Sequence, residues 1–129
     1  MNAARAYARA TSETASKERL MVLLFEAALR HMRVAASHLE SNQPAVALPL
    51  LTKASDIVTE LAGTLDSAVS PELADTLGQV YLFVAQRLAI ASFSKDAATV
   101  REAERAFAPV VEGFQQAVAS MGTDAAGAR

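Results

Sequence analysis

The segment 80–96, VYLFVAQRLAIASFSKD, carries hydrophobic residues on two opposite sides of a predicted helix. At about 100° per residue, the first stripe is formed by Val80, Val84, Leu88 and Ala91. The second stripe is formed by Leu82, Phe83, Ala89, Ile90 and Phe93. A narrow polar seam at Gln86 and Arg87 separates them. A bundle helix needs only one apolar stripe for its core, so the second is either covered by further helices or available to a partner.

The region before this segment predicts two helices. Ser16 is a suitable N-cap for the first, which should end near SNQP, residues 41–44. The second has an apolar stripe from Leu50 to Leu65, which includes Leu51 and Val58. Pro49 conflicts with this helix because proline lacks a backbone N–H. We therefore expect a kink there or a helix start near Leu48.

Two more helices are predicted from their start signals. Ser70-Pro71-Glu72 places an N-cap, a first-turn proline and a first-turn acid in order, and the helix that follows should run to about Phe93. The last helix is capped by Ser94 or Asp96 and is expected to bend at Pro109.

These elements predict an all-α fold. No strand alternation, internal repeat or long linker occurs, and helices of roughly 22–25 residues joined by short loops must run antiparallel to their neighbours. We expect an antiparallel up-down four-helix bundle over residues 16–121. Residues 1–15 should form a mobile or loosely docked N-terminal segment, and residues 122–129 a disordered tail.

Composition narrows the function classes. The chain has 129 residues, 52% of them hydrophobic, which suffices for one core without disulfides. A net charge of −2 offers no basic surface for phosphates, so we expect no nucleic-acid partner. The chain has no cysteine, which excludes disulfides and thiolate metal sites and fits a reducing cytosol. No secretory signal and no run of about 18 uncharged apolar residues is found, so we expect no membrane insertion.

Catalytic motifs are missing as well. The sequence has no nucleophile elbow, no phosphate-binding glycine loop and no Glu-x-x-His pair for a di-metal bundle. His31 and His38 are seven residues apart and share one helix face, but two histidines alone make a poor metal site. We expect a protein that is not an enzyme and that holds no cofactor or metal.

Several short motifs occur together along the chain. They are Tyr7 ahead of Thr14-Ala15-Ser16, LMVLLFEAAL at 20–29, Glu60-Leu61, Leu65-Asp66, Val80-Tyr81, Phe83, Arg87-Leu88, Ala91 and Asp96. Spread from Tyr7 to Val118, they resemble the pattern of the flagellin-export chaperones of the FliS family. Phe114 stands where many members have tryptophan, which removes an indole donor and keeps the apolar framework.

The resemblance implies a cytoplasmic chaperone. Such a protein binds the disordered C-terminal segment of flagellin, prevents its premature polymerisation and delivers it to the flagellar type III export apparatus. In the family, the client forms short helices in apolar grooves, and the chaperone's own N-terminal segment can occupy one groove when the client is absent. We therefore expect client contacts on the second stripe of the third helix, with Leu51 and Val58 beside it and Tyr7 covering the empty groove. The stripe residues in question are Leu82, Phe83, Ala89, Ile90 and Phe93.

Two other interpretations remain open at this point. A helical adaptor would use the same apolar face to form a homodimer and would have no peptide client. A histidine phosphotransfer domain, also a four-helix bundle, would carry phosphate on His31 or His38. Neither histidine is followed by the Lys-Gly pair typical of those domains.

Overall fold

Four helices account for most of the chain that the structure describes, residues 17–65 and 70–127, with side chains described as far as residue 120. In this computed structural model they are α2 (Lys17–Glu40), α3 (Pro44–Ala62), α5 (Pro71–Ser94) and α6 (Ala97–Gly127). No strand occurs in the described ranges, and the predicted all-α fold is confirmed. Residues 1–15, with Tyr7, lie outside the described residues.

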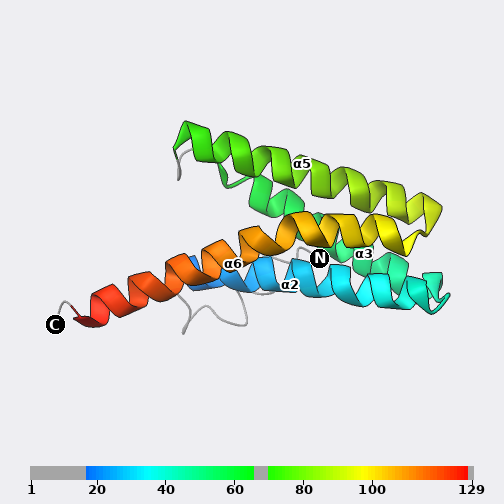
Figure 1. Ribbon diagram of the computed structural model, residues 1–129, viewed down its shortest axis with the longest axis horizontal. Helices are drawn as coiled ribbons and strands as arrows, with labels where there is room; N and C mark the ends of the chain where they lie inside the picture. Colours follow the sequence, from blue (N-terminus) through cyan, green and yellow to red (C-terminus); the bar gives the residue numbers. More distant parts are fainter. Residues whose placement is uncertain (1–16, 66–69, 128–129) are drawn as a thin grey trace.

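The helices form an up-down bundle in which each one runs opposite to the one before it (Figure 1). α2 packs against α3 and α6, and α5 packs against the same two helices, so α2 and α5 lie on a diagonal. α5 makes more of its contacts with α6 than with α3. Among the described residues, one side of α5 therefore has no helical neighbour.

The ends of α5 follow the predicted signals. The hydroxyl of Ser70 accepts a hydrogen bond from the backbone N–H of Leu73 at 3.2 Å, and Pro71 occupies the first turn. At the other end Lys95 adopts a left-handed conformation, with φ 58°, and its N–H donates to the carbonyl of Ala91 at 2.7 Å. Asp96 caps α6 by accepting from the N–H of Ala98 at 3.1 Å.

Two prolines lie inside helices that continue through them. α3 begins at Pro44 and includes Pro49, so the alternative start near Leu48 was wrong. α6 likewise continues through Pro109. Each proline removes one backbone hydrogen bond. Both side chains are exposed, so the carbonyl left without that bond can be hydrated.

α6 is longer than the sequence predicted. It remains helical to Gly127, beyond residue 121, where a frayed tail was expected to begin. No proline follows Pro109, and the alanines at 125 and 126 favour continued helix.

The core is centred on four aromatic rings from three helices. Phe25 of α2 stacks on Phe114 of α6 with ring centroids 4.4 Å apart, and it lies 5.8 Å from Phe107. Across the diagonal, its ring is 6.5 Å from that of Tyr81 on α5. Burial raises the pKa of Tyr81 to about 12. We call these four residues the aromatic cluster.

A chain of ion pairs joins α2 to α6 at the surface. Arg101 of α6 lies between two carboxylates, 2.9 Å from an oxygen of Glu40 and 2.8 Å from one of Glu104. Glu104 also accepts from Nε of Arg33 at 3.0 Å. Hydrogen bonding to Arg101 lowers the pKa of Glu40. For Glu104, burial raises the pKa, but the bonds from Arg101 and Arg33 together outweigh it, and the net direction is downward.

Among the described residues, no helix combines the length and the hydrophobicity needed to cross a bilayer.

The aromatic cluster should dominate stability. Phe25 is fully buried, so Phe25→Ala should lower the free energy of unfolding by about 3–5 kcal/mol in urea titrations followed by circular dichroism. Phe93→Ala is the matched control, because Phe93 is 88% exposed and should change stability by no more than about 0.5 kcal/mol. Equal losses in the two variants would show that the cluster is not the centre of the core.

The ion pairs predict acid sensitivity. Because the folded pKa of Glu104 lies below its ordinary value of 4.5, its stabilising contribution is present above pH 4.5 and is lost as the pH falls through the folded pKa. The melting temperature of the wild type should therefore fall below pH 4.5, and that of Arg101→Met should fall less steeply. Parallel curves for the two proteins would contradict this assignment.

Candidate functional site

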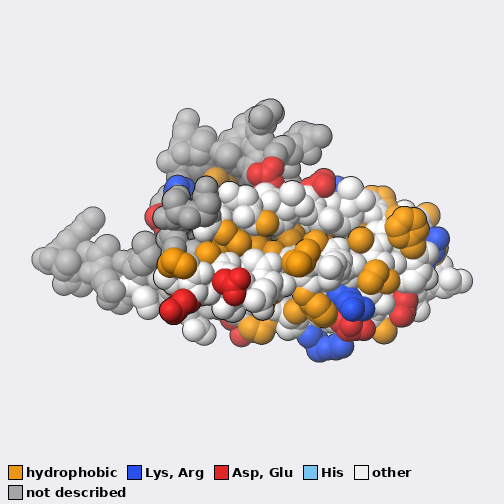
Figure 2. All heavy atoms as spheres, turned by 90° about the horizontal axis from the view of Figure 1, so that it is seen from above, with side chains coloured by type: hydrophobic (Ala, Val, Ile, Leu, Met, Phe, Trp, Pro, Cys, Tyr) orange, Lys and Arg blue, Asp and Glu red, His pale blue; other side chains and the backbone are white. Residues whose placement is uncertain are grey.

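The side of α5 that faces away from the bundle is hydrophobic. Leu82, Ile90 and Phe93 are 61%, 46% and 88% exposed, and Phe83 is 36% exposed. Ala89 is exposed between them. We call these five residues the exposed α5 face. Viewed from above, from the side of α5, hydrophobic side chains extend along much of the described surface, and the charged groups lie mostly toward its edges (Figure 2).

The opposite side of α5 forms its contact with the core. Its buried residues are Leu77, Tyr81, Val84, Leu88 and Ala91. The two stripes that the sequence predicts are thus both present, one buried and one exposed. Single exposed hydrophobic residues are common on protein surfaces, but four large ones on one helix face are typical of a surface that binds a partner.

The exposed α5 face contains few polar groups. Gln79 and Gln86 lie on the same side by helical spacing, so Gln86 falls within the exposed stripe and not, as predicted, in a seam between the two stripes. Gln79 donates to Asp75 at 3.0 Å. Between Thr76 and Ser94 the only charged residue of α5 is Arg87. A partner helix would therefore meet an apolar surface that has Arg87 of α5 and, beside it, Glu102 of α6 along one edge.

Arg87 lies between the exposed α5 face and α6. Its guanidinium carbon is 5.2 Å from the ring centroid of Phe83, in a cation–π arrangement. One terminal nitrogen is 3.6 Å from a carboxylate oxygen of Glu102 on α6, which is too long for a good hydrogen bond. Its Nε is buried and has no hydrogen-bond partner among the described residues.

Leu51 and Val58 lie elsewhere. They are 1% and 2% exposed and belong to the buried stripe of α3, together with Ala54, Ile57 and Leu61. The structure therefore does not place them on the surface with the exposed α5 face. Leu51 and Val58 have the helical spacing of core residues. Spacing shows which residues share a helix face, but it does not show whether another helix or a client covers that face.

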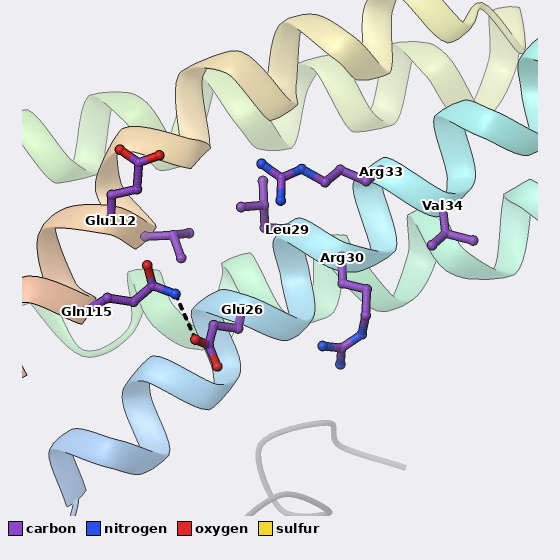
Figure 3. A pocket seen from close by; sticks show the side chains of 8 residues that line it. Glu26, Leu29, Arg30, Arg33, Val34, Glu112 and Gln115 are labelled. Atoms are coloured by element: carbon purple, nitrogen blue, oxygen red, sulfur yellow. Dashed lines mark hydrogen bonds between the residues drawn. The ribbon is translucent and has the colours of Figure 1, made fainter.

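One concave surface of the bundle was not predicted from the sequence. A cavity of about 510 Å³ lies between α2 and α6, on a different side of the bundle from the exposed α5 face. It is lined by Glu26, Leu29, Arg30, Arg33, Val34, Val111, Glu112 and Gln115. Glu26 and Gln115 face each other across one end, where the amide donates to the carboxylate at 2.7 Å (Figure 3). Two helices far apart in sequence supply its lining, so no local motif signals it.

The histidines do not form a shared site. His31 is half-buried, and burial lowers its pKa, with further lowering from Arg30 and Lys53. Nδ1 of His38 lies 2.8 Å from Oε1 of Gln43, at the turn between α2 and α3. No cluster of three or more potential metal ligands was found among the described residues.

Comparison of the sequence with known proteins identifies the protein family to which it is similar. The family described as flagellar protein FliS matches residues 1–121. A curated relative, the flagellar secretion chaperone FliS of Bacillus subtilis (strain 168), is 28% identical over 115 residues, which cover 89% of this chain and 85% of the relative. Phe25, Tyr81 and Phe107, which centre the bundle, and the exposed α5 face all lie within the matched region. Because the match extends over nearly the whole sequence, this chain belongs to the FliS family of flagellar proteins.

Proposed function

We propose that this protein, a flagellar export chaperone by family, binds the disordered C-terminal segment of flagellin on its exposed α5 face. Bound there in the cytoplasm, the segment is kept from premature polymerisation and is delivered to the flagellar type III export apparatus. The observation that supports this proposal is the row of four large exposed hydrophobic side chains on a helix whose other side is already buried.

The physical basis is the docking of an amphipathic helix on an apolar surface. A disordered segment that folds on binding loses conformational entropy, at a cost of roughly 2–5 kcal/mol. Full burial of one Leu, Ile or Phe side chain contributes roughly 1.5–3 kcal/mol. Leu82, Phe83 and Ile90 are partly exposed and Phe93 is almost fully exposed, so the burial of all four together can offset the ordering cost.

In the absence of flagellin, residues 1–15 would cover the same face, with the ring of Tyr7 on apolar surface and its hydroxyl in water. Leu51 and Val58, which are buried in the core, would contact the client only if the packing around α3 opened.

A homodimer through the exposed α5 face is the competing function. It would bury the same side chains against a second copy and would leave no surface for a client. Its signature is a concentration-dependent mass near twice 13.6 kDa that added flagellin does not change.

Calorimetry of the whole chain with a C-terminal flagellin peptide from the same organism tests the proposal. We expect one-to-one binding with a large negative heat-capacity change, because apolar surface is removed from water as the peptide folds. No heat at any temperature from a folded protein would reject the client and favour the homodimer.

A single substitution locates the binding surface. Leu82→Glu places a charge on the exposed α5 face and should weaken peptide binding at least about tenfold, because the carboxylate would be buried beside the client. Leu82 is 61% exposed, so the melting temperature should remain nearly unchanged. Val34→Glu is the control: Val34 is 40% exposed on α2, diagonal to α5, and its replacement should leave binding intact. Equal weakening by both substitutions would show that the client binds elsewhere.

A further inference from the structure

Arg87 and Arg101 differ in how completely their guanidinium groups are bonded. Arg101 donates to Glu40 at 2.9 Å and to Glu104 at 2.8 Å, so it bridges two carboxylates. Arg87 has one carboxylate nearby, Glu102 at 3.6 Å, and no hydrogen bond to any described residue is found for its Nε. Arg101 is thus bonded to two carboxylates, whereas Arg87 has one carboxylate nearby and an Nε–H that could donate to a second.

Arg87 lies where a docking helix would remove its water. Its guanidinium rests over Phe83, a member of the exposed α5 face, and 34% of its side-chain surface is still exposed. A helix docking on that face would remove water from both Arg87 and Glu102. Desolvating a guanidinium that has few hydrogen bonds is costly unless the incoming partner supplies acceptors.

We propose that Arg87 is a specificity-determining residue that binds an acidic side chain of the client helix. This inference rests on the proposed function, because it assigns a chemistry to the segment that occupies the exposed α5 face. The client carboxylate accepts hydrogen bonds from Nε and a terminal nitrogen, the fork geometry in which arginine binds carboxylates most strongly. Glu102 stays on the other terminal nitrogen, so the arrangement becomes that of Arg101.

The same movement affects Phe83. For Nε to reach an acceptor, the guanidinium must turn away from its present place over the ring. Phe83 is only 36% exposed with Arg87 above it, so this turn enlarges the apolar surface available to the client. A segment with apolar residues alone would leave Arg87 in place, and one with an acid at the matching position would both pair with Arg87 and uncover Phe83.

Arg87 attracts an acidic partner, while Glu102 beside it on α6, with 41% of its side chain exposed, carries the opposite charge. Arg87 is the only charge that α5 carries between Thr76 and Ser94. A basic side chain brought to this point would face a like charge across a surface that is losing its water. The expected client is therefore an amphipathic helix with an acidic residue at one edge of its apolar stripe.

The test compares four proteins in calorimetric titrations with the C-terminal flagellin peptide of the same organism. Arg87→Met keeps much of the side-chain length and removes the charge, and it should weaken binding about tenfold. Arg87→Lys keeps the charge without the fork and should fall between Arg87→Met and the wild type. Lys53→Met removes one exposed positive charge on α3, near His31 of α2, and should bind as tightly as the wild type.

Peptide variants identify the partner group. Each acidic residue of the peptide is changed in turn to its amide, and one peptide is amidated at its C-terminus. One side-chain change should cost the wild type about tenfold and cost Arg87→Met almost nothing, because the two partners of one interaction are then both removed. Coupling to the chain-end carboxylate instead would overturn the assignment to a side chain.

The remaining outcomes separate the two proposals. If the wild type binds the peptide and Arg87→Met binds it equally well, the role of Arg87 is rejected and the client surface stands. If Arg87→Met weakens binding but no peptide acid is coupled to it, Arg87 acts on the fold or on main-chain carbonyls, and the inference is again rejected. If the wild type does not bind, both proposals fail. Melting curves of all four proteins identify any loss caused by unfolding.

Discussion

The ring of Phe25 contacts three other aromatic rings, and these contacts decide which side of α5 faces the core. α5 has two apolar stripes, so hydrophobicity alone permits either one to turn inward. Only the inner stripe contains Tyr81, whose ring meets Phe25 across the bundle diagonal and Phe107 at 6.4 Å. Tilted and stacked ring pairs add roughly 0.5–1.5 kcal/mol each beyond the area they bury. The outer stripe has no aromatic partner of this kind among the described residues, and it remains exposed.

Much of this arrangement could be predicted from the sequence. The parts that could not be predicted share one cause. Local signals placed the helices and separated Leu82 and Phe93 from the core, because helical periodicity and caps depend on near neighbours in sequence. Contacts between helices have no such signal. The burial of Leu51 and Val58, the pair of Arg87 with Glu102, and the cavity between α2 and α6 each depend on which faces meet in space. Pro49 belongs to the same group: its cost to α3 is local, whereas the packing against α2 that outweighs it is not.

Polar links are distributed unevenly over the bundle. α2 and α6 are joined by Arg33, Glu104, Arg101 and Glu40, and by Glu26 with Gln115 at the other end of the interface. Between α5 and α6 the described side chains form one ion pair, that of Arg87 with Glu102. α5 is therefore held mainly by hydrophobic contacts, which are not directional and tolerate small shifts. If a client binds the exposed α5 face as proposed, it would load and leave without breaking the ion pairs that join α2 to α6.

The turn between α5 and α6 consists of Lys95 and Asp96, and both are fully used as caps. Lys95 closes α5 in a left-handed conformation, while Asp96 binds the Ala98 N–H and the buried hydroxyl of Thr99. Because both residues of this turn make capping hydrogen bonds, the turn cannot compensate for a change in the length of α5. One residue inserted or deleted in the second half of α5 would rotate Ile90 and Phe93 by about 100° around the helix axis. A change of length in the second half of α5 should therefore not be tolerated, because the outward direction of its apolar face depends on an unbroken count of residues from Tyr81 to Lys95.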